Sequence, residues 1–221
     1  MLPLFALATA ALPSSPNVLI LFADDLGAGD LQSYGHPTTS TPHLDALAAS
    51  GIRFTQWYSG FHVCTPSRAA MMTGRLPVRI GMVGAVWTGG VLGADAVGGL
   101  PQNETTIAEA LKGAGYARLA VGKWHLGMSS WGHIPKGRGF DTSLVYFEGA
   151  EDHWTQRSCI DPECIIPVNA SSIVPKGIPT DENGSSVFDF WHNDAPATDL
   201  VGRYNGHTFR DFAVDIVQSH E

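Results

Sequence analysis

The 221-residue sequence has few positive charges and no cluster of them. Lysine and arginine number 13 against 21 acidic residues, which gives a net charge of −8, and the first basic side chain is Arg53. Proteins that bind nucleic acid neutralise phosphates with grouped lysines and arginines, so we expect no nucleic-acid partner. The apolar runs are too short and broken to span a bilayer, and we expect no transmembrane segment. Three cysteines are too few for a disulfide-rich scaffold.

The apolar content is high enough for a sizeable core. Hydrophobic residues make up 44% of the chain and charged residues 15%, so wholesale disorder is not expected. Short apolar runs alternate with amphipathic stretches, which predicts an α/β fold. Strands are predicted over residues 17–23, 52–58, 116–121 and 143–147, helices are predicted to begin at Thr41, Thr106 and Thr208, and loops are predicted over residues 81–99 and much of 128–206.

The N-terminal residues have the composition of a secretory leader. Residues 1–12 are apolar and rich in small side chains, and Ala8-Thr9-Ala10 has the form of a signal-peptidase site. We therefore predict a signal peptide over residues 1–13, although it lacks a basic start. The alternative is an apolar leader without that role, or a wrongly chosen start.

Three glycosylation sequons also favour the secretory pathway. They begin at Asn103, Asn169 and Asn183, and each has the Asn-x-Ser/Thr form that N-glycosylation requires. In that oxidising route Cys159 and Cys164 could form a disulfide, provided that the geometry allows it. The alternative is that one of them pairs with a cysteine outside this chain.

Two segments contain candidate functional residues. Asp24 and Asp25 directly follow the predicted strand over residues 17–23, and adjacent carboxylates at a strand end suit a hard cation such as calcium. A surface turn with two solvated aspartates is the alternative. Cys64 precedes Pro66 at a predicted helix start, where the helix end and Arg68 favour an anion. Cys64 is then either an activated thiolate or a buried structural cysteine.

These segments resemble the signatures of the type I sulfatases. The run from Cys64 to Arg75 matches the family pattern C-x-P-S-R followed by Thr-Gly, and residues 122–127 (GKWHLG) match the second signature. Residues 16–27 are similar to the family's first strand and metal motif. The resemblance covers residues 16–148 in the expected order. Residues 138–142 and 151–154 are more similar to the arylsulfatase B branch, which acts on sulfated N-acetylgalactosamine, than to arylsulfatase A.

The resemblance implies an alkaline-phosphatase-like α/β fold, with a mixed or parallel sheet and helices on both faces. It implies hydrolysis of the sulfate ester of a small molecule or sugar. Cys64 would be oxidised by the formylglycine-generating enzyme, and the hydrated formylglycine would be the nucleophile. Asp24, Asp25 and the modified Cys64 would hold calcium. Arg68 would support the formylglycine, and a secretory location, lysosomal or extracellular, would follow.

Lys123 and His125 are the remaining residues to which the resemblance gives a role. Both would donate hydrogen bonds to the sulfate and to the formylglycine hydroxyl. They lie two residues apart, so an extended backbone would put them on the same side.

Sulfatases are longer than this chain, and their later half supplies further metal ligands, a second lysine and a second histidine. We therefore expect residues 14–221 to be a truncated, N-terminal part of a sulfatase catalytic domain. One alternative is a non-catalytic truncated product that binds a partner as a decoy. The other is a phosphatase or phosphodiesterase of the same fold, although those enzymes typically use a serine or threonine nucleophile.

Overall fold

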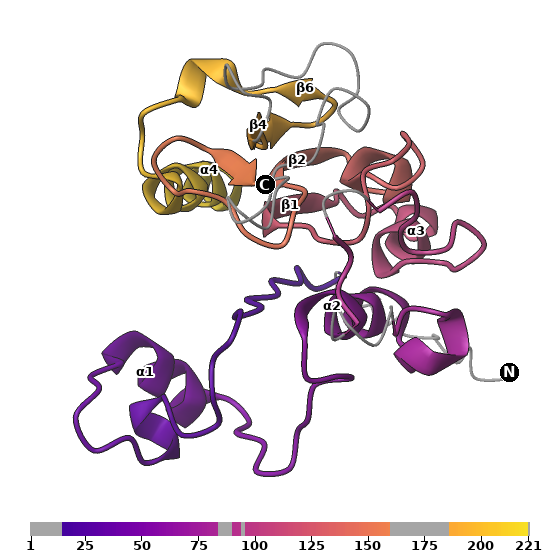
Figure 1. The fold of residues 1–221 in the computed structure, drawn as a ribbon. Coiled ribbons are helices and arrows are strands. Elements are labelled where there is room, and N and C mark those ends of the chain that lie inside the picture. Colours follow the sequence, from indigo (N-terminus) through magenta and orange to yellow (C-terminus); the bar gives the residue numbers. More distant parts are fainter. Residues whose placement is uncertain (1–14, 84–89, 94–95, 160–185, 221) are drawn as a thin grey trace, which may run out of the picture. The chain divides into compact units, whose positions relative to one another are not determined.

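The computed structural model describes residues 15–83, 90–93, 96–159 and 186–220 (Figure 1). The predicted signal peptide, the Cys159–Cys164 pairing and the sequons at Asn169 and Asn183 therefore lie outside what the structure describes. The chain divides after Thr55 into two compact units. Among the described helices, none is both long and apolar enough to cross a membrane.

The first unit, up to Thr55, is built around helix α1 (Pro42–Ser50). The helix begins after Thr41 and ends at Gly51, as predicted. The Asp45 carboxylate accepts hydrogen bonds from the Ser33 N–H at 2.9 Å and the Thr41 hydroxyl at 3.0 Å. These bonds tie α1 to the 3-10 helix η1 (Gln32–Tyr34).

The predicted strand over residues 17–23 is not formed in this unit. No strand is assigned there, and the side chains from Val18 to Leu21 are 51–71% exposed. A strand is stabilised by ladder hydrogen bonds to a neighbouring strand and by burial of its side chains. The described part of the first unit contains no strand with which residues 17–23 could pair.

The second unit, from Gln56 onward, contains a mixed sheet with the strand order β1-β2-β5-β6. Its strands are β1 (Leu119–Lys123), β2 (Thr142–Tyr146), β5 (Trp191–His192) and β6 (Ala195–Pro196). Strands β1 and β2 are parallel, in a register that pairs Lys123 with Tyr146, and the other two pairings are antiparallel. The predicted mixed sheet is confirmed.

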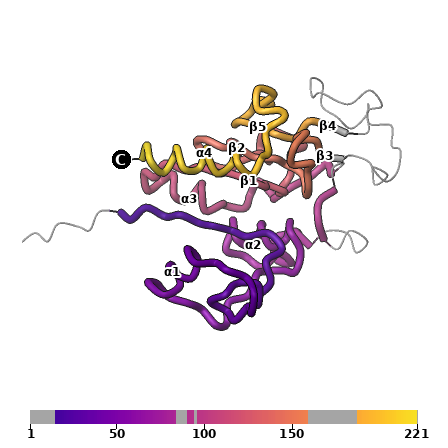
Figure 2. Tube along the Cα trace, turned by 90° about the vertical axis from the view of Figure 1, so that its left-hand side faces the viewer, coloured from indigo at the N-terminus to yellow at the C-terminus, as the bar shows by residue number. Residues whose placement is uncertain are grey.

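Helices cover both faces of this sheet, as predicted (Figure 2). Alternate residues of a strand point to opposite faces, and β2 shows this directly. Leu144 packs in a cluster with Phe209 and Phe212 of helix α4 (Asn205–Ser219). Val145 belongs to the larger cluster on the other face, which includes side chains of helices α2 (Cys64–Thr73) and α3 (Ile107–Gly113).

Helix α3 starts after Thr106, as predicted, with a capping box. The Thr106 hydroxyl accepts from the Glu109 N–H at 3.1 Å, and the Glu109 carboxylate accepts from the Thr106 N–H at 2.8 Å. This reciprocal pair satisfies two N–H groups that the first turn of a helix leaves open. The helix ends at Gly113.

Several predicted boundaries are wrong. The strand over residues 52–58 is absent, β1 begins three residues later than predicted, and α4 begins at Asn205 instead of Thr208. The stretch predicted as loop also contains short elements. They are the 3-10 helices η4 (Pro135–Arg138) and η6 (Thr198–Leu200), the strands β5 and β6, and the antiparallel pair β3 (Arg157–Cys159) and β4 (Ser186–Phe188). Outside this stretch, the 3-10 helix η2 (Pro77–Ile80) follows α2. Strands of two or three residues are too short to show a period in the sequence.

Candidate active site

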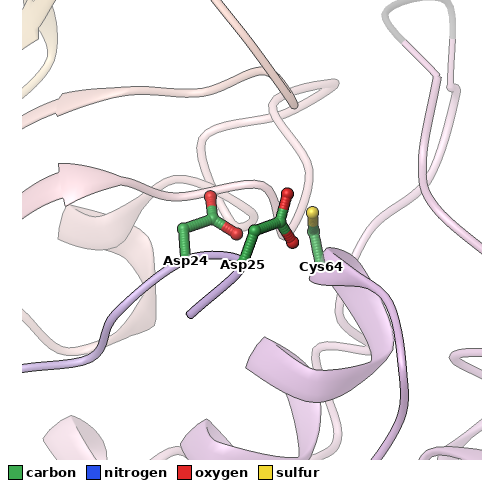
Figure 3. Close-up of side chains that lie close together, drawn as sticks. All are labelled: Asp24, Asp25 and Cys64. Carbon is green, nitrogen blue, oxygen red and sulfur yellow. The ribbon is translucent and has the colours of Figure 1, made fainter. Parts of the chain in front are cut away.

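Cys64 is the first residue of α2, as the sequence predicts. Val63 before it is extended, and the next turn of the helix, from Thr65 to Ala69, is buried. The Cys64 side chain is half-buried, and its sulfur is directed away from the helix (Figure 3). The N-terminal end of a helix carries a partial positive charge, which favours an anionic group at this position.

Lys123 is the residue that the structure brings to Cys64. It is the last residue of β1, and its Nζ donates to the Cys64 sulfur at 3.1 Å. The two residues are 59 positions apart in sequence. A cation therefore lies beside the sulfur, at the carboxyl end of a parallel strand, where ligands bind in α/β sheets.

Arg68 ties these two segments together. It is only 8% exposed, and its guanidinium donates to the Lys123 carbonyl at 2.6 Å. A buried guanidinium must be hydrogen-bonded, because its desolvation is otherwise not compensated. This bond joins the helix that carries Cys64 to the strand that carries Lys123. The structure therefore assigns Arg68 a contact with the Lys123 backbone.

The extended backbone that would put His125 on the same side as Lys123 is not formed. Strand β1 ends at Lys123, and His125 has a φ of 53°, in the left-handed region. Its side chain is 3% exposed, and its Nε2 lies 2.9 Å from the Leu92 carbonyl. Because a carbonyl only accepts, Nε2 of this imidazole carries a proton.

Leu92 links His125 to the start of α2, a connection that the sequence did not indicate. The Leu92 N–H donates to the Thr65 hydroxyl at 3.1 Å, and its carbonyl accepts from His125. Thr65 is the neighbour of Cys64. One residue of a glycine-rich stretch thus holds both signature segments, through backbone atoms that carry no sequence pattern.

Asp24 and Asp25 lie in the first unit, at a bend that follows residues 17–23. Both are exposed, and Asp25 has a φ of 53°, which aspartate tolerates better than most residues. Figure 3 shows the side chains of both residues as sticks. Calcium takes about six to eight oxygen ligands and favours carboxylates. These two residues fit such an ion as part of its ligand set, whereas a cysteine sulfur is a soft donor that suits calcium poorly.

Comparison with known proteins identifies the relatives of this chain. A family model described as Sulfatase matches residues 16–219. Bovine arylsulfatase A (Bos taurus) is 48% identical over 158 residues, which cover 71% of this chain and 29% of that protein. Steryl-sulfatase of Mus musculus is 50% identical over 137 residues, which cover 60% of this chain and 22% of that protein. The chain thus spans less than a third of the length of these relatives.

Solved structures are also similar to this chain. The crystal structure of Ps i-CgsB has a TM-score of 0.68 and 28% identity, and the match covers 88% of this chain and 39% of that chain. A second structure of that protein, in complex with k-i-k-neocarrahexaose, gives the same values.

Proposed function

Because the chain belongs to the sulfatase family, we propose that it forms the nucleophile-bearing part of an enzyme that hydrolyses sulfate esters. The expected alkaline-phosphatase-like fold agrees with the structural likeness to Ps i-CgsB. The contact between Lys123 Nζ and the Cys64 sulfur carries the proposal. It puts a hydrogen-bond donor and a positive charge beside the side chain that the C-x-P-S-R motif marks for oxidation.

We propose that Cys64 is converted to formylglycine by the formylglycine-generating enzyme. The sulfur would then be replaced by oxygen, and the hydrated aldehyde supplies a hydroxyl nucleophile. Lys123 would donate to that oxygen and stabilise negative charge on it, which its contact with the Cys64 sulfur supports. Arg68 fixes the Lys123 backbone against α2. His125 would donate to the sulfate group from Nδ1, because its Nε2 already donates to the Leu92 carbonyl.

A calcium ion is the cofactor that we propose for Asp24 and Asp25, with an oxygen of the modified Cys64 as a further ligand. Replacement of the soft sulfur by oxygen supports this, because oxygen is the ligand that calcium prefers. When bound, the ion would polarise the sulfate oxygens as a Lewis acid. Two carboxylates and one hydroxyl are only part of a calcium ligand set.

The substrate class that we propose is a sulfated small molecule or sugar. Bovine arylsulfatase A and mouse steryl-sulfatase are named for sulfate esters, and the structure of a similar protein holds k-i-k-neocarrahexaose. The preference for the arylsulfatase B branch stays a prediction.

We propose a secretory location, lysosomal or extracellular, because cysteine oxidation of this kind belongs to that route in the family. Asn103, the sequon asparagine that the structure describes, supports this: it is exposed, in a turn before α3.

Peptide mass spectrometry of protein from its native secretory source tests the modification. The target is the tryptic peptide from Phe54 to Arg68, which contains Cys64. We expect an aldehyde or its hydrate at Cys64, and an aldehyde-reactive hydrazide probe should label the wild type but not C64A. Unmodified thiol in every copy would contradict the proposal and favour the non-catalytic alternative. Matched aryl sulfate and aryl phosphate esters then separate a sulfatase from a phosphatase of the same fold.

A further inference from the structure

Asp189 is a buried carboxylate between β4 and β5, and it binds the segment that follows β2. It is 2% exposed. Its two oxygens accept from the Phe147 and Glu148 N–H groups, each at 2.8 Å, and the Ser158 hydroxyl lies 2.9 Å away. Residues 147 and 148 are therefore held by a side chain about 40 positions away in sequence. Such a bond to a buried carboxylate is among the stronger hydrogen bonds in proteins.

The segment that Asp189 holds lies against His125. The His125 N–H donates to the Phe147 carbonyl at 3.0 Å. A Cβ atom added at Gly149 would lie 2.8 Å from the Cε1 of the His125 imidazole, so the ring occupies the space that this glycine leaves open. The left-handed backbone of His125 is disfavoured for a residue with a side chain, and it persists only where its surroundings hold it.

We propose that Asp189 is a positioning residue for His125, which it holds in place through the backbone of residues 147–149. The inference rests on the proposed function in one respect, since it takes His125 to be part of the sulfatase site. Asp189 itself touches neither the imidazole nor Cys64 in any described contact.

Ser158 completes the hydrogen bonding of Asp189. Its hydroxyl lies 2.9 Å from the Asp189 carboxylate and 2.9 Å from the Ala150 carbonyl, although it has only one proton to donate. A proton on Asp189 would satisfy both contacts, because the carboxyl would donate to Ser158 and Ser158 to Ala150. Burial raises the pKa of Asp189 to about 6, against the lowering effect of the hydrogen bonds from the Phe147 and Glu148 N–H groups and from Ser158.

The variant D189N tests the proposal with little change of volume. An amide has one oxygen, so the substituted side chain can accept from only one of the two N–H groups. In the ¹⁵N-labelled 221-residue chain we expect shifted imidazole resonances for His125, assigned by their loss in H125Q. We also expect amide hydrogen exchange at Phe147 or Glu148 to quicken by about tenfold or more. The control E151Q removes another buried carboxylate, one whose described hydrogen bond is to Asn205, and should leave the His125 resonances unchanged.

A folded D189N chain with unchanged His125 resonances would overturn the proposal. If D189N does not fold, the variant S158A tests the proposal instead. It keeps the hydrogen bonds from the Phe147 and Glu148 N–H groups to Asp189 but removes the one from Ser158 to the Ala150 carbonyl. We expect smaller but measurable shifts of the His125 imidazole resonances. Unchanged resonances in S158A would then overturn the proposal. The imidazole resonances do not depend on turnover, so this result stands even if Cys64 proves unmodified.

Discussion

Glu151 gives the chain a pH-dependent stability that one substitution should remove. It lies in the segment after β2 and is 9% exposed. The amide of Asn205, the first residue of α4, donates to one carboxylate oxygen. The other oxygen is buried and makes no hydrogen bond to the described residues. Burial raises the pKa of Glu151 to about 8; the Asn205 amide lowers it, and the charges of Asp189 and Asp152 raise it further.

The sign and size of the effect follow from this pKa. The folded chain keeps the Glu151 proton up to about pH 8, whereas the unfolded chain releases it near the ordinary value of 4.5. The contribution to stability is therefore fully present below that lower value and is lost as the pH rises through the upper one. At about 1.36 kcal/mol per pH unit, the loss between pH 5 and pH 8 is about 3 kcal/mol. E151Q is neutral throughout and lacks this loss.

Urea unfolding at pH 5, 6.5 and 8, followed by tryptophan fluorescence, measures the difference. Trp154 is a suitable probe because its ring lies 5.3 Å from that of Tyr204, just before α4. Between pH 5 and pH 8 the wild-type midpoint should fall by about 1–3 M urea more than that of E151Q. Asp189 makes the stability of both chains depend on pH, with a smaller loss than Glu151 causes, so the difference between the two chains mainly reports Glu151. The comparison variant is D152N, at an exposed neighbour whose pKa the Thr155 N–H lowers. It keeps the buried Glu151 carboxylate and removes only the smallest contribution to its raised pKa, so it should keep most of the wild-type fall. Equal slopes for wild type and E151Q would refute the reasoning.

Two further predictions concern other parts of the second unit. R138M should lower the free energy of unfolding by about 3 kcal/mol or more, because the buried Arg138 donates to the Leu100 carbonyl at 2.8 Å and pairs with Glu109. R75M breaks a surface ion pair with Glu104 and should lower the free energy of unfolding by less than about 1 kcal/mol. Urea unfolding measures both variants, and equal losses of stability in R138M and R75M would contradict this prediction. In secreted protein, N103Q and T105A should each remove one glycan while T105S keeps it, as glycosidase treatment and intact mass would show; an unchanged mass for N103Q would rule out glycosylation at this site.

The helices and their ends were largely predictable from the sequence. Thr41-Pro42 and Gly51 bound α1, Thr106 and Glu109 form the capping box of α3, and Gly74 ends α2 with a φ of 66°. These features act within a few residues, so the local sequence contains the physical cause. The start of α4 was missed because Tyr204, at its N-cap position, makes no side-chain capping bond.

The strands were less predictable because pairing is a long-range property. Residues 17–23 and 143–147 both have the composition of a buried strand. The second of these segments forms β2 between two partner strands, while the first has no assigned strand. The same reason explains why Leu92 and Asp189 escaped notice. Each acts across more than 25 positions, and Leu92 does so through backbone atoms alone.

The second signature shows what spacing alone leaves open. Lys123 and His125 would lie on one side only if the backbone between them were extended, because alternation holds along a strand. The ladder ends with the pairing of Lys123 and Tyr146, and the left-handed φ of His125 breaks the alternation directly after it. Lys123 is thereby directed to Cys64 while His125 binds Leu92. Because Arg68 holds the Lys123 carbonyl and Leu92 binds both Thr65 and His125, the two signatures form one hydrogen-bonded structure. A change in either signature should therefore alter the geometry of the other.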